Sequence, residues 1–123
     1  MAAERIIKVL YSDMMHARMM AVTRGREHYV VLGNTAYSVV EDTNDSGIKD
    51  GGDMTLPDFP KKVEASLSWN NAGNDVTFDK RGIMPKWRTI RVASATDADY
   101  DCIAVSTTRV IMGQYVNSKC QPK

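Results

Sequence analysis

The chain has 123 residues, of which 43% are hydrophobic and 25% are charged, and its formal net charge is +1. This length fits one domain with its own core, and this charge excludes a chain that binds nucleic acid or membranes through bulk charge. No apolar run approaches the roughly 20 residues that a membrane-spanning helix needs.

The first segment, residues 3–24, has the apolar period of an amphipathic helix. Steps of three and four residues define its apolar face, which consists of Ile6, Ile7, Leu10, Met14, Ala17 and Ala21. The opposite side carries Arg5, Lys8, Ser12 and His16. Gly25 follows directly and is suited to end the helix.

After Gly25 the pattern changes to that of β-strands. We expect strands at residues 27–32, 36–41, 62–69, 76–80, 89–93, 102–106 and 110–116. The turn Gly33-Asn34-Thr35 suits a hairpin between the first two. The sequence therefore predicts an α+β fold, with a long N-terminal helix packed on antiparallel β-sheets. We expect one structural domain, made of the helix at 1–25 and a β-rich head at 26–123.

The helix carries four methionines beside a histidine, which are ligands that suit Cu(I). Helical spacing places Met14 on the core face, His16 and Met20 on the polar flank, and Met15 and Met19 on a third side. Ligands that diverge around a helix cannot meet at one ion. The pattern therefore favours ordinary packing of methionine side chains.

No catalytic motif is present: the chain lacks GxSxG, HExxH, the P-loop and GxGxxG. Its two histidines, His16 and His28, are expected at the surface or half-buried. The sequence therefore predicts that the protein is not an enzyme.

Two cysteines, Cys102 and Cys120, lie in the last quarter of the chain without CxxC or zinc-ligand spacing. Two free buried thiols and a disulfide that ties the C-terminal tail to a strand both fit this pattern. The redox compartment decides between them, so the residues alone leave both open.

The segment EDTNDSGIKDGGD, residues 41–53, follows the rhythm of a calcium loop counted from Asp42. The expected ligands are Asp42, Asn44, Ser46, the carbonyl of Ile48, Asp50 and Asp53. Gly47 would permit the sharp bend. A structural Ca²⁺ held here would bind weakly, with a Kd of roughly 10⁻⁴–10⁻³ M. The alternative is a solvated hairpin loop whose polar residues and glycines make turns.

Three short motifs occur in a fixed order: ARMMAV at 17–22 before Val30-Val31-Leu32, VTFDKRG at 76–82, and IAVSTTRV at 103–110. In that order they resemble the GspH/FimT group, the minor pseudopilins of type II secretion and minor pilins of type IV pili. Physically, Ala17 and Ala21 allow close helix packing. Phe78 is expected in the core, and Gly82 in a turn conformation that disfavours side chains.

The chain also departs from that group. It opens MAAERIIKVL, where members carry a leader, Phe, Glu and about 20 apolar residues. We expect residues 3–24 to continue a removed transmembrane half-helix. Thr108 replaces the usual Gly before Arg109, and Ile111 stands where DNA-uptake members tend to have a second Arg.

The resemblance implies an assembly or capping subunit of a pilus or secretion pseudopilus that acts through protein contacts and needs no active site. Its partners would be other pilin or pseudopilin subunits. It would lie in the bacterial inner membrane, with a periplasmic or extracellular head. In that compartment the disulfide between Cys102 and Cys120 is favoured.

Two other functions stay open at this point. One is a minor pilin that binds DNA for uptake through basic residues near the C-terminus, Arg109, Lys119 and Lys123. The other is an extracellular calcium-binding β-domain unrelated to pili. The motifs also do not distinguish a secretion pseudopilus from a type IV pilus.

Overall fold

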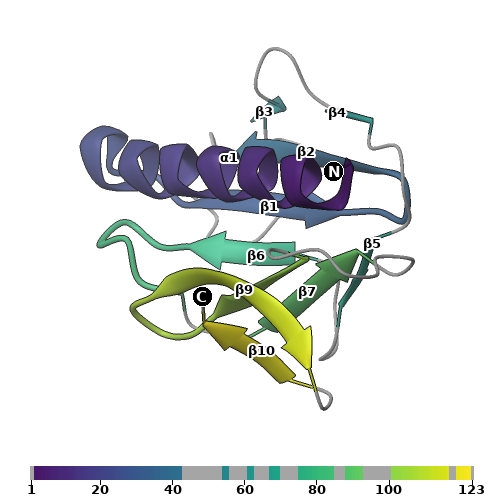
Figure 1. Ribbon diagram of the computed structural model, residues 1–123. Coiled ribbons are helices and arrows are strands. Elements are labelled where there is room, and N and C mark those ends of the chain that lie inside the picture. Colours follow the sequence, from purple (N-terminus) through teal and green to yellow (C-terminus); the bar gives the residue numbers. More distant parts are fainter. Residues whose placement is uncertain are drawn as a thin grey trace.

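The architecture is that of one helix lying on two antiparallel β-sheets (Figure 1). The structure is a computed structural model, and it describes residues 2–42, 54–55, 61–62, 67–69, 75–84, 88–92, 101–116 and 119–122. This is the α+β class that the sequence predicts, with the long helix at the N-terminus.

Helix α1 (Ala2–Arg24) agrees with the predicted segment 3–24. All six residues of the predicted apolar face are buried, and the four residues of the opposite side are exposed. Gly25 follows the helix with φ 64°, a left-handed conformation that ends it as predicted. Within the described ranges, no helix is long and apolar enough to cross a membrane.

The first sheet is built around the β1–β2 hairpin. Its members are β1 (His28–Leu32), β2 (Ala36–Glu41), β3 (Met54–Thr55), β4 (Lys61–Lys62) and β6 (Asp75–Phe78). The order is β3-β2-β1-β6, and β4 also pairs with β2. Register places His28 opposite Glu41 and Leu32 opposite Tyr37. The hairpin turn closes where Gly33 N donates to Ala36 O at 2.8 Å.

The second sheet contains the C-terminal half of the chain. Its members are β5 (Leu67–Trp69), β7 (Arg88–Val92), β8 (Cys102–Val105), β9 (Val110–Val116) and β10 (Lys119–Pro122). The order is β10-β9-β8-β7-β5. In β7, Arg88, Ile90 and Val92 are buried, so Thr89 and Arg91 lie on the other, outer face.

One predicted strand was wrong, and two strands were missed. Residues 62–69 do not form one strand, because β4 pairs with β2 in the first sheet whereas β5 pairs with β7 in the second. Alternation of side chains along the sequence cannot reveal that β4 and β5 belong to different sheets. The missed strands are β3, which has two residues, and β10, whose Pro122 is tolerated because β10 is an edge strand.

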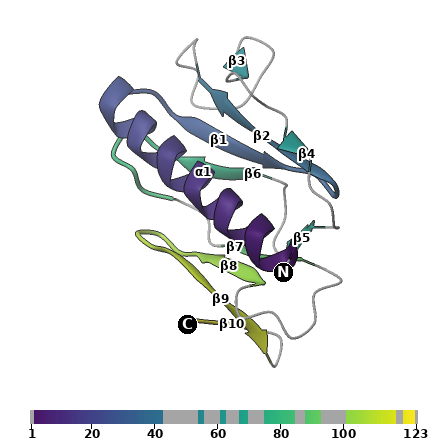
Figure 2. The ribbon, with the colours of Figure 1, turned by 45° about the horizontal axis from the view of Figure 1, so that its top comes forward.

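The helix covers both sheets at once. Figure 2 shows α1 running diagonally over the region where the two sheets meet. It contacts β1 and β6 of the first sheet and β7, β8 and β9 of the second. The helix face joins both sheets in one core, which contains Ile6, Ile7, Leu10, Met14, Ala17, Ala21, Val30, Leu32, Tyr37, Val39, Leu67, Val76, Phe78, Met84, Ile90, Val92, Ile103, Val105 and Val110.

A disulfide joins Cys102 in β8 to Cys120 in β10, with 5.9 Å between the Cα atoms. Strand β9 lies between these two strands in the sheet. The bond therefore attaches the C-terminal edge strand to the middle of the sheet by a covalent link that spans β9.

We expect the Cys102→Ser/Cys120→Ser variant to lose about 2–4 kcal/mol of unfolding free energy. The bond closes a segment with a sequence separation of 18 residues, which restricts the unfolded chain. Urea denaturation of the variant and of the oxidised wild type measures the loss. Reduced wild type should behave like the variant. Equal midpoints with and without the bond would contradict the expectation.

Candidate functional site

Three segments that are distant in the sequence meet beside the C-terminal half of α1. Arg18 Nη2 donates a hydrogen bond to Thr108 O at 3.1 Å, which joins the helix to the β8–β9 turn. Met84 N donates to Thr107 O at 2.9 Å, which joins the segment after β6 to the same turn. Gly82, the last residue of the 76–82 motif, also lies against Arg18 and Val22 of α1. Residues of all three sequence motifs therefore meet at one place in the fold.

The turn after β6 is organised by the Asp79 carboxylate. Its Oδ1 accepts from Arg81 N and Ile83 N, both at 2.9 Å. Burial acts to raise the pKa of Asp79, but these two hydrogen bonds and the nearby Arg81 guanidinium outweigh it and leave the pKa below its usual value. The ionised carboxylate therefore holds the turn that presents Gly82 to the helix.

Gly82 is required here for two reasons. Its φ of 78° lies in the left-handed region that favours glycine. A Cβ atom at this position would lie 3.0 Å from Val22 Cγ2 and 3.4 Å from Arg18 Nε. The predicted turn role of Gly82 is thus confirmed, and so is the core position of Phe78.

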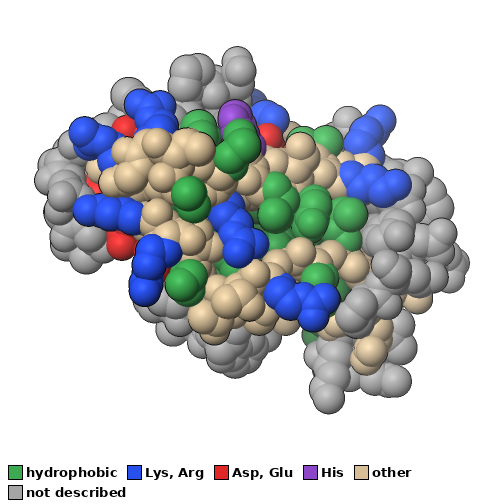
Figure 3. All heavy atoms as spheres, turned by 90° about the vertical axis from the view of Figure 1, so that its left-hand side faces the viewer, with side chains coloured by type: hydrophobic (Ala, Val, Ile, Leu, Met, Phe, Trp, Pro, Cys, Tyr) green, Lys and Arg blue, Asp and Glu red, His purple; other side chains and the backbone are tan. Residues whose placement is uncertain are grey.

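An apolar patch lies on the flank of α1 above this junction. We call it the helix-end patch; its residues are Met15, Arg18, Met19, Val22 and Thr23, and they line a hollow of about 350 Å³. The side chains of Met19 and Val22 are 56% and 51% exposed. Figure 3 views the molecule from the end at which α1 terminates, and apolar side chains gather there among Lys and Arg side chains.

The other methionines of the helix pack as the sequence predicts. Met14 is buried in the core, and Met15 and Met20 are partly buried against it. His16 is exposed. These three methionines therefore serve packing, and Met15 also lines the helix-end patch.

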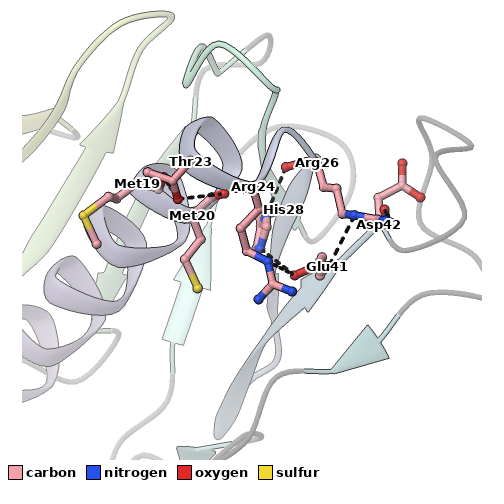
Figure 4. Close-up of polar contacts among 8 residues, drawn as sticks. All are labelled: Met19, Met20, Thr23, Arg24, Arg26, His28, Glu41 and Asp42. Carbon is pink, nitrogen blue, oxygen red and sulfur yellow. Dashed lines mark hydrogen bonds and ion pairs between the residues drawn. The ribbon is translucent and has the colours of Figure 1, made fainter.

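A buried carboxylate fixes the end of α1 to the first sheet (Figure 4). Glu41 in β2 is 2% exposed. Its Oε1 lies 3.1 Å from Arg24 Nε and 3.4 Å from His28 Nε2, and its Oε2 lies 3.7 Å from Arg26 Nε. His28 Nδ1 lies 3.0 Å from Arg26 O, so an Nδ1–H donates to that carbonyl. The last helical residue and the two strands of the hairpin thus meet at one acid.

The burial of His28 corrects the sequence-based prediction. We expected both histidines at the surface or half-buried, but His28 is 0% exposed. The cause is pairing in the hairpin, since His28 lies directly opposite Glu41 and both side chains lie under the helix end. Arg24, the last residue of α1, has its Nε 3.1 Å from Oε1 of this carboxylate.

A second polar cluster connects the middle of α1 with the first sheet. Tyr37 OH donates to Asp13 Oδ2 at 2.5 Å, and Lys61 Nζ lies 2.9 Å from the same oxygen. Burial, the hydrogen bond to Asp13 and the charge of Asp13 raise the pKa of Tyr37 far above its ordinary value. The sequence reasoning missed this cluster, because Asp13 had no visible partner along the chain.

The predicted calcium loop lies almost entirely outside the described residues. Of its six expected ligands, Asp42 is described, whereas Asn44, Ser46, Ile48, Asp50 and Asp53 are not. Asp42 is buried; its N donates to Glu27 O at 2.9 Å, and its O accepts from Arg26 Nη1 at 3.4 Å. Among the described residues, no group of three His, Cys, Asp or Glu side chains could hold a metal ion. Calcium binding by this loop stays a prediction.

Of the three residues predicted to bind nucleic acid, two lie within the described structure, and their backbone positions are at opposite ends of β9. Arg109 is exposed in the turn that precedes β9. The Lys119 backbone pairs with Val116, at the other end of the same strand. A strand of this length separates the two backbone positions by roughly 20 Å. Lys123 lies outside the described residues. DNA binding through these residues stays a prediction.

Comparison with known proteins gives one finding about family. The family model described as "Type II transport protein GspH" matches residues 7–109, which is well over half of the chain. The matched region begins in α1 and ends at the β8–β9 turn, so it contains the junction at Arg18, Gly82 and Thr108. The search of curated proteins and the search of solved structures gave no match.

The two left-handed glycines allow a matched test of the junction. We expect Gly82→Ala to lower the unfolding free energy by about 2–4 kcal/mol, from backbone strain plus the crowding of Val22. Gly25→Ala has similar strain, but a Cβ there meets nothing within 4 Å, so it should cost about 1–2 kcal/mol. Urea denaturation measures both.

A double variant tests the contact itself. Val22→Ala should recover part of the cost in the Gly82→Ala background, because it removes the methyl group that the new Cβ meets. Two results together would contradict a role for the close approach of Gly82 to Val22. The first is an equal loss of unfolding free energy in Gly82→Ala and Gly25→Ala, and the second is additive effects of Gly82→Ala and Val22→Ala.

We also expect Tyr37→Phe to weaken the dependence of stability on alkaline pH. The raised pKa of Tyr37 keeps the native hydroxyl protonated above pH 10, where the unfolded chain releases this proton. Native stability should therefore fall with rising pH, by up to about 1.4 kcal/mol per pH unit from this residue. Urea denaturation between pH 9.5 and 11.5 should show a shallower slope for Tyr37→Phe. Tyr11→Phe is the control, and equal slopes for wild type and Tyr37→Phe would contradict the role of the cluster.

Proposed function

Because the chain belongs to the GspH family, the minor pseudopilins of type II secretion, we propose that it takes part in assembly or capping of the pseudopilus through protein–protein contacts. The helix-end patch is the observation that carries this proposal. Its partners are other pseudopilin subunits. The head acts on the periplasmic side of the inner membrane, and anchoring through an apolar half-helix stays a prediction of the family resemblance.

The helix-end patch has the properties that such a contact needs. Met19 and Val22 are large apolar side chains that are half exposed on a helix whose other face is fully buried. Exposed apolar surface of this kind favours association with another protein. Thr23 Oγ1 donates to Met19 O at 3.0 Å, and Arg18 is held by Thr108, so the patch lies on backbone and side chains that are already fixed.

A fixed surface is favourable for assembly, since little conformational entropy remains to be lost when the partner binds. The proposed contact requires no chemistry. The family is a structural one, which agrees with the sequence-based expectation that the protein is not an enzyme.

Family membership reduces the number of alternative functions. It excludes an extracellular β-domain unrelated to pilin-like proteins. The family description names type II transport, which favours a secretion pseudopilus over a type IV pilus. Binding of DNA by Arg109 has no second observation that supports it beyond the exposure of this side chain.

We expect the Met19→Lys/Val22→Lys variant to reduce secretion of type II substrates at least tenfold, because two ammonium groups would have to be buried at the subunit contact. The measurement is the amount of secreted substrate in the medium of cells that express the variant in place of the wild type. The same variant should fail to cross-link with neighbouring pseudopilins.

The control is His16→Lys, which places a new charge on an exposed position of the same helix outside the patch. It should secrete normally. Both variants should melt within about 2 °C of the wild type, since exposed positions contribute little to stability. Normal secretion by a folded Met19→Lys/Val22→Lys variant would exclude the helix-end patch as the assembly surface.

A further inference from the structure

The outer face of the second sheet contains a small pocket on the strands β5, β7 and β9. It has a volume of about 180 Å³ and is lined by Ser68, Trp69, Thr89, Arg91 and Tyr115. None of these residues belongs to the helix-end patch. Arg91 and Thr89 are the outward-facing residues of β7, so their side chains leave the sheet on the side away from the core.

Arg91 is the distinctive residue of this pocket. Its guanidinium lies over the Tyr115 ring, 4.2 Å from the ring centroid. Its Nε is buried and has no hydrogen-bond partner. Within the part of the chain that the structure describes, no carboxylate oxygen lies within ion-pair distance of Arg91, whereas in the other sheet Arg24 Nε lies 3.1 Å from Glu41 Oε1.

A neighbouring acid is engaged elsewhere. Asp101 precedes Cys102, the residue opposite Arg91 in the register of β7 and β8. The Asp101 side chain accepts from Tyr115 N at 2.7 Å, so this carboxylate helps to hold the strand that carries the aromatic ring. Among the described residues, the sheet thus supplies a half-buried guanidinium and a ring beneath it, and no carboxylate pairs with that guanidinium.

The lining defines the chemistry of a ligand. A guanidinium donates several hydrogen bonds in one plane and matches a carboxylate through two parallel bonds. Stacking on Tyr115 holds this plane in place, and the Tyr115 ring supplies an apolar wall. Trp69 lies opposite Ile90 and packs against the core, so its ring is on the inner face of the sheet. Ser68 and Thr89 add hydroxyl groups. Among the described lining residues Arg91 carries the one positive charge, which suits a singly charged anion better than a phosphate.

We propose that this pocket binds a single carboxylate of another polypeptide. Two sources carry that chemistry: the C-terminal residue of a chain and an acidic side chain. The proposal concerns a different face from the helix-end patch and does not depend on the assembly role.

Small probes test the pocket on the isolated chain. Amide chemical shifts would be followed by NMR during titration with N-acetyl-phenylalanine, N-acetyl-glutamic acid α-amide, N-acetyl-phenylalanine amide and inorganic phosphate. We expect saturable shifts at Ser68, Thr89 and Arg91 with the two carboxylates. The neutral amide should cause none. Tighter binding of the first probe would identify a C-terminal residue as the source, and tighter binding of the second an acidic side chain.

Variants identify the group responsible. Arg91→Gln should weaken carboxylate binding at least tenfold, and Arg91→Lys should weaken it less, because it keeps the charge but loses the planar fork. Arg109→Gln is the matched control, since it removes an exposed arginine outside the pocket. The amide spectra of all three should keep the dispersion of the folded wild type.

Three results would overturn the proposal. The first is the absence of saturable shifts with either carboxylate in the wild type. The second is undiminished binding in folded Arg91→Gln. The third is equal or tighter binding of phosphate or of the neutral amide at the same residues, which would assign the pocket to another ligand class. None of these measurements involves secretion, so their outcome is separate from that of the assembly proposal.

Discussion

The two sheets bury their inner faces against the same side of α1, and the rest of the structure depends on that shared contact. The sheets have separate strand orders, with β6 ending one and β5 ending the other in the described residues. The apolar face of the helix contacts strands of both. Each fully buried aliphatic side chain on it, such as Ile7 or Leu10, contributes about 1.5–3 kcal/mol of transfer free energy. Ala17 and Ala21 keep the helix close to the strands because their side chains are small.

Polar contacts then fix the position of the helix on this core. Glu41 receives two arginines and a histidine at the helix end, Asp13 receives Tyr37 and Lys61 in the middle, and Arg18 bonds the β8–β9 turn. Apolar burial is non-directional, whereas the hydrogen bonds at Asp13 and Arg18 have defined geometry and the ion pairs at Glu41 join specific groups. The first two bind the helix to one sheet and the third binds it to the other. The exposed flank of α1 is consequently a surface of fixed shape.

The molecule presents two surfaces with different chemistry. The helix-end patch is apolar, and its one arginine is occupied by a backbone carbonyl. The pocket of the second sheet instead presents an arginine that pairs with no carboxylate among the described residues. An apolar surface selects a partner by shape, whereas a guanidinium without a paired acid selects it by charge. Both surfaces can be occupied at the same time, because they lie on different elements.

The sequence by itself determined the helix, its buried face and most of the strands. These follow from local periodicity: steps of three and four define the face of α1, and alternation defines strands such as β7. The motifs at 17–22, 76–82 and 103–110 also identified the family. The tertiary structure alone decided which distant residues meet. It buried His28 beside Glu41, placed Asp13 next to Tyr37 and Lys61, divided residues 61–62 and 67–69 between two sheets, and left Arg91 over Tyr115. Periodicity reports which face of an element is buried, but it contains no information on the partner across the sheet or beneath the helix, and the site chemistry depends on those partners.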